Sequence, residues 1–238
     1  MKFEKPLIPA RLIRRYKRFL ADVRLEDGTE LTVHCPNSGS MAGCAGEGWP
    51  VLLSESPNPK RKYHHTWELV HNGRCWIGIN THRANTVAVE GITHGTVTEL
   101  AGYGGLRREV PYGDCSRVDI LLENGDSSCY VEVKNVTLVD GEGRYAFPDA
   151  VTVRGQKHLR ELTAMVAQGH RAAMLFVIQR SDGSIFVPAD PIDPDYGEAL
   201  RGAVASGVEA LAYRAEVSPE GVTLSESVEI DLSRSPGT

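Results

Sequence analysis

The sequence predicts an α+β protein with two domains, a small all-β barrel at residues 1–80 and an α/β domain at residues 81–238. Three observations predict this division. About five short apolar runs separated by Gly-rich turns fill the first third of the chain, which is typical of a small barrel. The order of elements then changes to helix, strands, helix and strand, as in an α/β sandwich. One run in this second part is apolar throughout, which is typical of a strand buried on both faces.

The expected barrel strands are separated by recognisable turns. Asp27-Gly28 supplies a tight turn, Asn72-Gly73 supplies another, and a Gly-, Ser- and Pro-rich loop covers residues 36–48. An oligonucleotide-binding (OB) barrel is the natural candidate, although periodicity alone does not separate it from other small barrels. The strands are expected at residues 18–25, 31–34, 51–53, 67–70 and 75–79.

The second part begins with a helix that Asn85 caps and that runs toward Leu100. An amphipathic helix is expected at residues 155–168, because its apolar residues form one stripe and Gly169 ends it. A last helix is expected at residues 194–206. The expected strands cover residues 106–112, 117–123, 129–138, 172–178, 208–215 and 222–230.

The composition excludes several classes of protein. Hydrophobic residues make up 41% and charged residues 24% of the chain, as in ordinary globular proteins. No apolar run approaches the roughly 18 residues of a membrane span, and the basic N-terminus lacks the pattern of a secretion signal, so a cytoplasmic protein is expected. The five cysteines are an odd number without a C-x-x-C pair, which argues against a disulfide framework and a zinc ribbon.

The net charge of −5 does not by itself favour a nucleic-acid partner, but the charge is unevenly distributed. Residues 2–18 contain seven Lys or Arg against one Glu, and much of the acidity lies in the C-terminal third. This polarity would orient a polyanion toward one end of the molecule. The candidate phosphate contacts, or alternatively a solvated basic face, are Arg11, Arg14, Arg15, Lys17, Arg18, Lys60, Arg61 and Lys62.

The most informative stretch is residues 116–134. Asn124-Gly125 is a strong hairpin turn, so Glu123 is expected to face Asp126, and Asp119 to lie opposite Tyr130. Strand alternation then gives one polar and one aliphatic face. The polar face would hold Arg117, Asp119, Tyr130, Glu132 and Lys134, and the aliphatic face Val118, Ile120, Leu122, Val131 and Val133.

The polar face predicts a metal site. Two carboxylates that lie close together repel each other unless a cation sits between them, and oxygen ligands without a histidine suit Mg²⁺ or Mn²⁺. Asp119 and Glu132 are therefore the expected metal ligands, and Lys134 would orient a water or stabilise charge on a phosphate. Such a site is suited to phosphodiester hydrolysis. The alternative is a set of solvated charges on an exposed sheet face.

Other candidates are less specific. Glu109 is either a further metal-site carboxylate or a surface charge, and Gln156 lies where the N-terminus of a helix could meet a phosphate. His158 could act as a general base, but a position on the helix surface is the favoured expectation. The aromatic residues that could stack on bases are Trp67, Trp76, Tyr16 and Tyr63. Most of them are expected to be core residues instead.

Asp119 followed by Glu132-Val133-Lys134 resembles the PD-(D/E)XK nuclease motif, with Val118 in place of the proline. More widely, residues 15–23, 34–41, 60–69, 147–152 and 154–162 resemble the sugar fermentation stimulation protein A family, and the resemblance covers nearly the whole chain. It implies an N-terminal OB-like domain, a C-terminal restriction-endonuclease-like domain, DNA binding and a regulatory link to sugar metabolism.

Two functions therefore compete. The first is a Mg²⁺-dependent nuclease that uses Asp119, Glu132 and Lys134, and the second is a non-catalytic DNA-binding regulator that uses the same surface only for binding. In both, the partner is a nucleic acid, with DNA favoured. A helix-turn-helix reader at residues 198–213 ranks last, because Gly202 and Gly207 weaken the helices and the segment is acidic.

Overall fold

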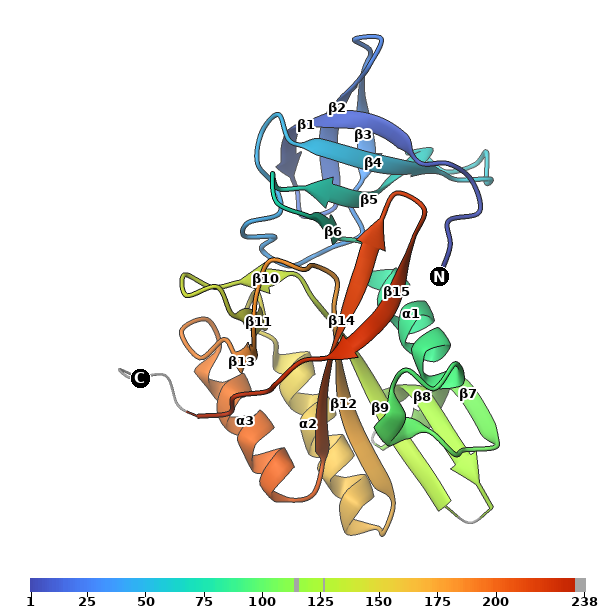
Figure 1. Ribbon diagram of the computed structural model, residues 1–238, viewed down its shortest axis with the longest axis vertical. Helices are drawn as coiled ribbons and strands as arrows, with labels where there is room; N and C mark the ends of the chain where they lie inside the picture. The colour runs from blue at the N-terminus through green and yellow to red at the C-terminus, as the bar shows by residue number, and fades with distance from the viewer. Residues whose placement is uncertain (114–115, 126, 234–238) are drawn as a thin grey trace.

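A computed structural model describes residues 1–113, 116–125 and 127–233, and shows a β-barrel mounted on an α/β domain (Figure 1). The strand order in the barrel is β3-β2-β1-β4-β5-β6, and a bridge between His34 and Thr66 joins β3 to β5. This bridge closes five of the strands on themselves, which confirms the OB-like barrel. The strands are β1 (Ile8–Tyr16), β2 (Leu20–Leu25), β3 (Glu30–His34), β4 (Pro50–Glu55), β5 (His65–His71) and β6 (Trp76–Gly78).

The strand β1 was not expected from the sequence. Ala10 and Leu12 are buried in the barrel while Arg11 between them is exposed, and a register shift after Leu12 leaves Arg14 exposed as well. The shift and the outward charges obscure the alternating pattern. The next strand begins later than predicted because Lys17 and Arg18 form the turn, both with positive φ (49° and 62°).

The second domain is built on a mixed six-stranded sheet of order β15-β14-β12-β9-β8-β7. Its members are β7 (Gly105–Tyr112), β8 (Ser116–Asn124), β9 (Ser127–Val136), β12 (Arg171–Ile178), β14 (Glu209–Ser218) and β15 (Gly221–Ser227). Strand β12 is parallel to both β9 and β14, and it is buried along almost its whole length, as its apolar sequence predicted. A small second sheet contains β10 (Leu138–Val139), β11 (Tyr145–Phe147) and β13 (Phe186–Pro188).

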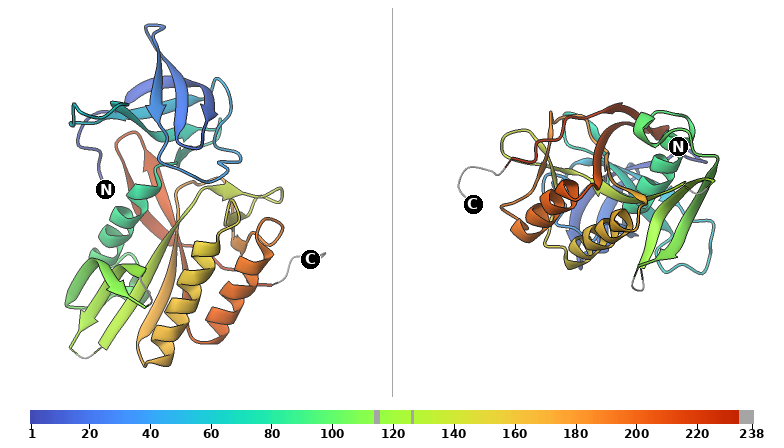
Figure 2. Two further views of the ribbon diagram at one scale, coloured as in Figure 1. Left: turned by 180° about the vertical axis from the view of Figure 1, so that it is seen from behind. Right: turned by 90° about the horizontal axis from the view of Figure 1, so that it is seen from below.

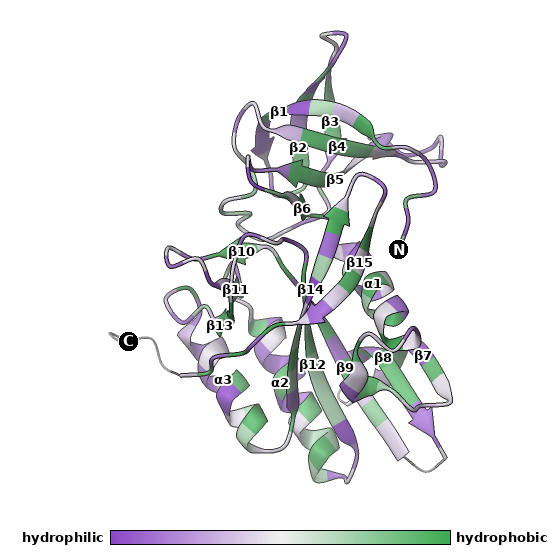
Figure 3. Cartoon of the chain, in the orientation of Figure 1, coloured by the Kyte–Doolittle hydropathy of each residue, from purple (hydrophilic) through white to green (hydrophobic). Residues whose placement is uncertain are grey.

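Helices cover both faces of the large sheet (Figure 2). Helix α1 (Thr81–Thr93), followed by the short 3-10 helix η1 (Thr98–Leu100), packs on one face, and α2 (Val153–Ala167) and α3 (Pro194–Ala205) pack on the other. The helices turn their apolar residues toward the sheet, and β12 between them is apolar (Figure 3). The predicted α/β domain is therefore confirmed.

Two helix predictions need correction. Helix α1 starts earlier than expected, because Asn80 rather than Asn85 is its N-cap and accepts the N–H of His82 (3.1 Å). The helix-turn-helix prediction for residues 198–213 is wrong, because α3 is followed by strand β14 and not by a second helix. Gly207, with a φ of 100°, makes the turn between them.

Two further observations on the described part of the chain concern its helices and its cysteines. None of its helices combines the length and the apolar character that crossing a bilayer requires. Its cysteines Cys35, Cys44, Cys75 and Cys129 are free thiols, whereas Cys115 lies outside the described residues.

Polar contacts join the two domains. The N–H of Gly78 donates to the carbonyl of Gln179 (2.9 Å), and Asn72 donates to the carboxylate of Asp182 (2.7 Å). The carboxylate of Asp182 also pairs with the buried Arg180 (2.6 Å). These contacts set the barrel on the end of the sheet at which β9 and β12 finish.

Candidate metal centre and interdomain pocket

The hairpin of β8 and β9 brings the predicted carboxylates together. Asn124 pairs with Ser127 and Ile120 pairs with Val131, so the register is shifted by two residues from the predicted one. The predicted partner of Glu123, Asp126, lies outside the described residues. A shift of two residues preserves the face of each side chain in the paired segment. Asp119 and Glu132 are the next positions along the two strands, just beyond the last pair.

The backbone pairing of the two strands ends at Ile120 and Val131, and Asp119 occupies the place where they separate. Its Oδ2 accepts the free N–H of Val133 (2.8 Å), and its Oδ1 accepts a hydrogen bond from Asn85 of α1 (2.7 Å). The predicted aliphatic face is interrupted here, because Val118 packs in the core under α2 while Ile120 packs under α1.

Glu132 is buried, at 2% exposure, and its two oxygens differ. Oε1 accepts a hydrogen bond from Lys134 Nζ (2.6 Å) and contacts Nδ1 of His158. Nε2 of His158 accepts from Arg154 (3.3 Å), which leaves the proton of that ring on Nδ1, facing Glu132. Oε2 is buried and has no hydrogen-bond partner within the described residues. One oxygen of this carboxylate is therefore available to a ligand.

The electrostatics of the two carboxylates would favour a cation over an anion at this oxygen. Burial and the charge of Glu132 raise the pKa of Asp119 above its usual value. Burial would also raise the pKa of Glu132, but the hydrogen bond from His158 and the charge of Lys134 outweigh it and lower this pKa. Glu132 is thus held ionised next to the partly buried carboxylate of Asp119, and a cation between them would relieve the repulsion.

The residues present fit a hard divalent cation. Free carboxylate oxygen, without sulfur or a ligating histidine, suits Mg²⁺ or Mn²⁺ rather than zinc. Across the described ranges, no group of three or more His, Cys, Asp and Glu could hold a metal. A cation held by Asp119 and Glu132 would therefore complete its coordination with water or phosphate oxygens.

The two less specific candidates, Glu109 and Gln156, make contacts with residues other than Asp119 and Glu132. Glu109 is exposed on the edge strand β7, opposite Asp119, with a φ of 53°, and its carbonyl accepts a hydrogen bond from Arg117 (3.1 Å). Gln156 donates to Asp193 (3.3 Å), the N-cap of α3. Gln156 is therefore engaged with α3 rather than with Glu132.

The prediction that His158 lies on the helix surface is wrong. The residue is 5% exposed and contacts both Glu132 and Lys134, whose Nζ is 3.1 Å from Nδ1. The sequence did contain a signal for this position: His158, Leu162 and Met165 are spaced four and three residues apart, which places the histidine on the buried stripe of α2.

The predicted basic cluster of β1 has mixed roles. Arg15 donates to four backbone carbonyls, including those of Asn37 (2.9 Å) and Gly39 (2.8 Å), and so holds the loop that follows β3. Arg14 pairs with Asp22 (2.8 Å). Among the aromatic residues, Trp67 is fully buried in the barrel core, whereas Tyr16, Tyr63 and Trp76 are only partly buried, so the expectation that most of them are core residues is not met.

The remaining predicted cations lie in loops or on the barrel surface. Lys17 and Arg18 form the tip of the β1–β2 hairpin, and residues 60–62 lie between β4 and β5, where Arg61 donates to Thr66 (3.2 Å). Lys60 and Lys62 are exposed in the same loop, and Arg11 is exposed on the barrel. Arg18 is the member of the predicted set that lines the pocket beside the metal centre.

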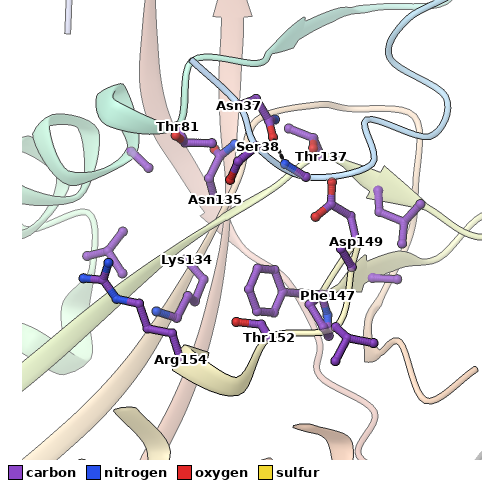
Figure 4. A pocket seen from close by; sticks show the side chains of 18 of the residues that line it. Asn37, Ser38, Thr81, Lys134, Asn135, Thr137, Phe147, Asp149, Thr152 and Arg154 are labelled. Carbon is purple, nitrogen blue, oxygen red and sulfur yellow. Dashed lines mark hydrogen bonds between the residues drawn. The ribbon is translucent and has the colours of Figure 1, made fainter. Parts of the chain in front are cut away.

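This pocket lies between the two domains and has a volume of about 520 Å³. Its walls come from the loop after β3, from the start of α1, from the end of β9 and from residues 146–154. Figure 4 shows Lys134 and Arg154 on one side of the pocket, with Asn37, Asn135 and Asp149 on another. Because Lys134 contacts Glu132, the pocket opens directly beside the candidate metal centre.

Comparison with known proteins agrees with this architecture. The model of the SfsA N-terminal OB domain matches residues 13–79, and the model of the sugar fermentation stimulation protein RE domain matches residues 82–221. The chain belongs to the sugar fermentation stimulation protein family. The family resemblance of the sequence is therefore confirmed.

Relatives in this family match nearly the full chain. A sugar fermentation stimulation protein homolog from Geotalea uraniireducens is 58% identical over 232 residues, which cover 98% of this chain and 100% of that protein. A homolog from Geobacter sulfurreducens is 60% identical over 230 residues, 97% of this chain and 98% of that protein. A solved structure described as Pyrococcus furiosus SfsA in complex with Ca²⁺ has a TM-score of 0.84 and 26% identity, and covers 97% of this chain and 98% of that one.

Proposed function

We propose that this member of the sugar fermentation stimulation protein family binds nucleic acid, DNA in the first place, and hydrolyses its phosphodiester bonds with a divalent cation. The observation that carries this proposal is the free, buried Oε2 of Glu132 beside Asp119, at the point where β8 and β9 separate. The description of the related Pyrococcus furiosus structure names Ca²⁺, which supports a divalent cation in a protein of this fold. Mg²⁺ or Mn²⁺ is the ion proposed for hydrolysis.

Each residue of the centre has a distinct task in this proposal. Asp119 and Glu132 hold the cation, which when bound supplies Lewis acidity and lowers the pKa of a water ligand. Lys134, whose side chain is 13% exposed, donates to a non-bridging phosphate oxygen or to the attacking water. His158 and Arg154 form a chain behind Glu132 that fixes its orientation.

A non-catalytic, DNA-binding function is the second candidate. Lys134 lies 2.6 Å from Glu132 and so neutralises this carboxylate in the absence of any cation. The same surface, with Arg18 and Arg154 exposed at its edge, would then hold a phosphate backbone without cutting it.

Cleavage assays separate the two candidates. Purified protein is incubated with single- and double-stranded DNA and RNA in Mg²⁺, in Mn²⁺ and in EDTA, beside Asp119→Ala and Lys134→Ala variants. Metal-dependent cleavage that both substitutions abolish would establish the nuclease. Binding without cleavage by the wild type would favour the second candidate. Cleavage that survives both substitutions would identify a contaminating enzyme.

A further inference from the structure

We infer that the interdomain pocket beside Asp119 and Glu132 holds the base of an unpaired nucleotide. The favoured substrate is then a nucleic acid in which the nucleotide next to the cleaved phosphodiester bond is unpaired. This inference rests on the proposed function, because it concerns the nucleotide adjoining the phosphate at the metal centre. The pocket volume of about 520 Å³ falls within the roughly 300–1,000 Å³ of pockets that take small molecules.

One side of the pocket suits a phosphate. Lys134 and Arg154 both line it, and Thr152, which caps the N-terminus of α2 by accepting the N–H of Gly155 (3.0 Å), lies on the same wall. Cations beside the N-terminus of a helix attract anions, and the carboxylates of the metal centre lie immediately behind Lys134. A phosphate bound here would therefore lie next to the candidate metal centre.

The opposite side suits the edge of a base. Asn135 Oδ1 accepts a hydrogen bond from Gln179, while its Nδ2 is buried without a hydrogen-bond partner among the residues that the structure describes. Asn37 is 4% exposed, and its amide is fixed because Oδ1 accepts the N–H of Gly39 (2.9 Å). Amide groups match the donor and acceptor pattern of base edges, which favours a base over a simple hydrocarbon ligand.

Both domains must contribute for the pocket to exist. Oδ2 of Asp149 accepts the N–H of Met41 (3.2 Å), and a Cβ on Gly39 would overlap this carboxylate, so the loop after β3 fits tightly against residues 147–150. Figure 4 shows the loop residues Asn37 and Ser38 close to Asn135 at the end of β9.

Exposed apolar side chains belong to, or are next in sequence to, residues that line the pocket. The exposed large hydrophobic side chains of the described residues include Phe19 (51% exposed), Val151 (70%) and Val153 (70%). Val151 lines the pocket, Val153 precedes Arg154, and Phe19 follows Arg18, another lining residue. Aromatic and aliphatic surface next to cations is typical of sites that bind single-stranded nucleic acid through base stacking.

Binding measurements with the full-length protein test this inference. Fluorescence anisotropy in Ca²⁺ compares a single-stranded oligodeoxynucleotide, its duplex and the same single strand with abasic sites. We expect the intact strand to bind about 10-fold or more tightly than the abasic strand, because contacts to one base contribute about 1–3 kcal/mol. Ser38→Trp, which fills the pocket from an exposed position, should remove this preference. Ser40→Trp, exposed in the same loop but outside the pocket lining, should retain it.

Calorimetric titration with Mn²⁺ separates the possible failures. Equal affinity of the wild type for intact and abasic strands, with Mn²⁺ still bound, would overturn the base pocket and leave the proposed metal centre intact. If the wild type binds neither the strand nor Mn²⁺, both the base pocket and the proposed metal centre are overturned. The abasic comparison uses the wild type, so it decides the question even if Ser38→Trp does not fold.

Discussion

Substitution of Asp119 by Asn is expected to stabilise the protein in EDTA and to abolish its stabilisation by divalent cations. Burial raises the pKa of Asp119, and the charge of the neighbouring Glu132 raises it further, so the two carboxylates repel each other. Asparagine removes this repulsion and keeps one oxygen for the N–H of Val133, now 2.8 Å from the carboxylate. Asn85, which donates to the other oxygen, can turn its own amide oxygen toward the new NH₂ group.

The magnitudes follow from these contacts. Removal of a strained functional charge commonly stabilises a protein by about 0.5–2 kcal/mol, and about 1 kcal/mol shifts the melting temperature of a chain of this size by roughly 2–4 °C. A cation at about 100 times its Kd stabilises the wild type by about 2.7 kcal/mol, which corresponds to roughly 5–11 °C. Thermal unfolding in EDTA and in Mn²⁺ measures both effects.

The matched control is Glu123→Gln, on the same strand but in an exposed pair with Arg107, and it should leave the response to Mn²⁺ unchanged. An equal Mn²⁺-induced rise in the melting temperature of Asp119→Asn and of the wild type would refute the assignment of Asp119 as a metal ligand. A lower melting temperature of the variant in EDTA would refute the repulsion between the two carboxylates.

Three further predictions concern the domain interface and the pocket. Burial acts to raise the pKa of Asp182, but hydrogen bonds from Arg180 and Asn72 hold this pKa well below its usual range. The ion pair of Asp182 with Arg180 therefore stabilises the fold fully at pH values above the usual Asp pKa of about 4. This stabilisation is lost as the pH falls through the lower pKa of the folded state. Asp182→Asn should lower the free energy of unfolding at neutral pH by about 3–5 kcal/mol, measured by urea denaturation, because Arg180 stays buried without a counter-charge, and the difference from the wild type should shrink in acid. Gly39→Ala should cost about 1–3 kcal/mol in the same assay, because its Cβ overlaps the carboxylate of Asp149. Arg18→Ala should weaken DNA binding and reduce its salt slope by about 1.

Each of these predictions has a matched control. Glu30→Gln removes a pair in which both side chains are 57% exposed, and should change stability far less than Asp182→Asn. Adding Asp149→Ala to the Gly39→Ala variant should restore stability, and additive losses would contradict the predicted overlap. Arg11→Ala, which changes a barrel residue at another surface hollow, should leave the salt dependence of DNA binding unchanged. An equal effect of the Arg11 and Arg18 substitutions would contradict a specific role of Arg18 in DNA binding.

The sequence predicted the fold well where apolar periodicity was undisturbed. The apolar run of β12 and the apolar stripe of α2 can be recognised from the order of residues alone, because the burial of each follows its own periodicity. Strand β1 was missed because Arg11, Arg14 and Arg15 give it the composition of a solvated segment. The local pattern therefore predicts a strand only when its outward side chains do not dominate the composition.

The approach of the two carboxylates was predictable because a shift of two residues in a hairpin preserves the faces of the paired segment, although Val118 and Ile120 lie on opposite faces beyond it. The contacts that complete the centre were not, because Asn85 and His158 arrive from helices distant in the sequence. The pocket depends on the docking of Asn37 of the barrel against Asp149 and Asn135 of the second domain. No local pattern encodes this docking, since it is set by packing between domains.

Anomalous diffraction from crystals soaked in Mn²⁺ tests whether Asp119 and Glu132 together hold a divalent cation. We expect a single strong anomalous peak in contact with the carboxylate of Asp119 and Oε2 of Glu132, with Lys134 beside it. Well-ordered carboxylates that point apart in the soaked crystals, with no anomalous density between them, would contradict it.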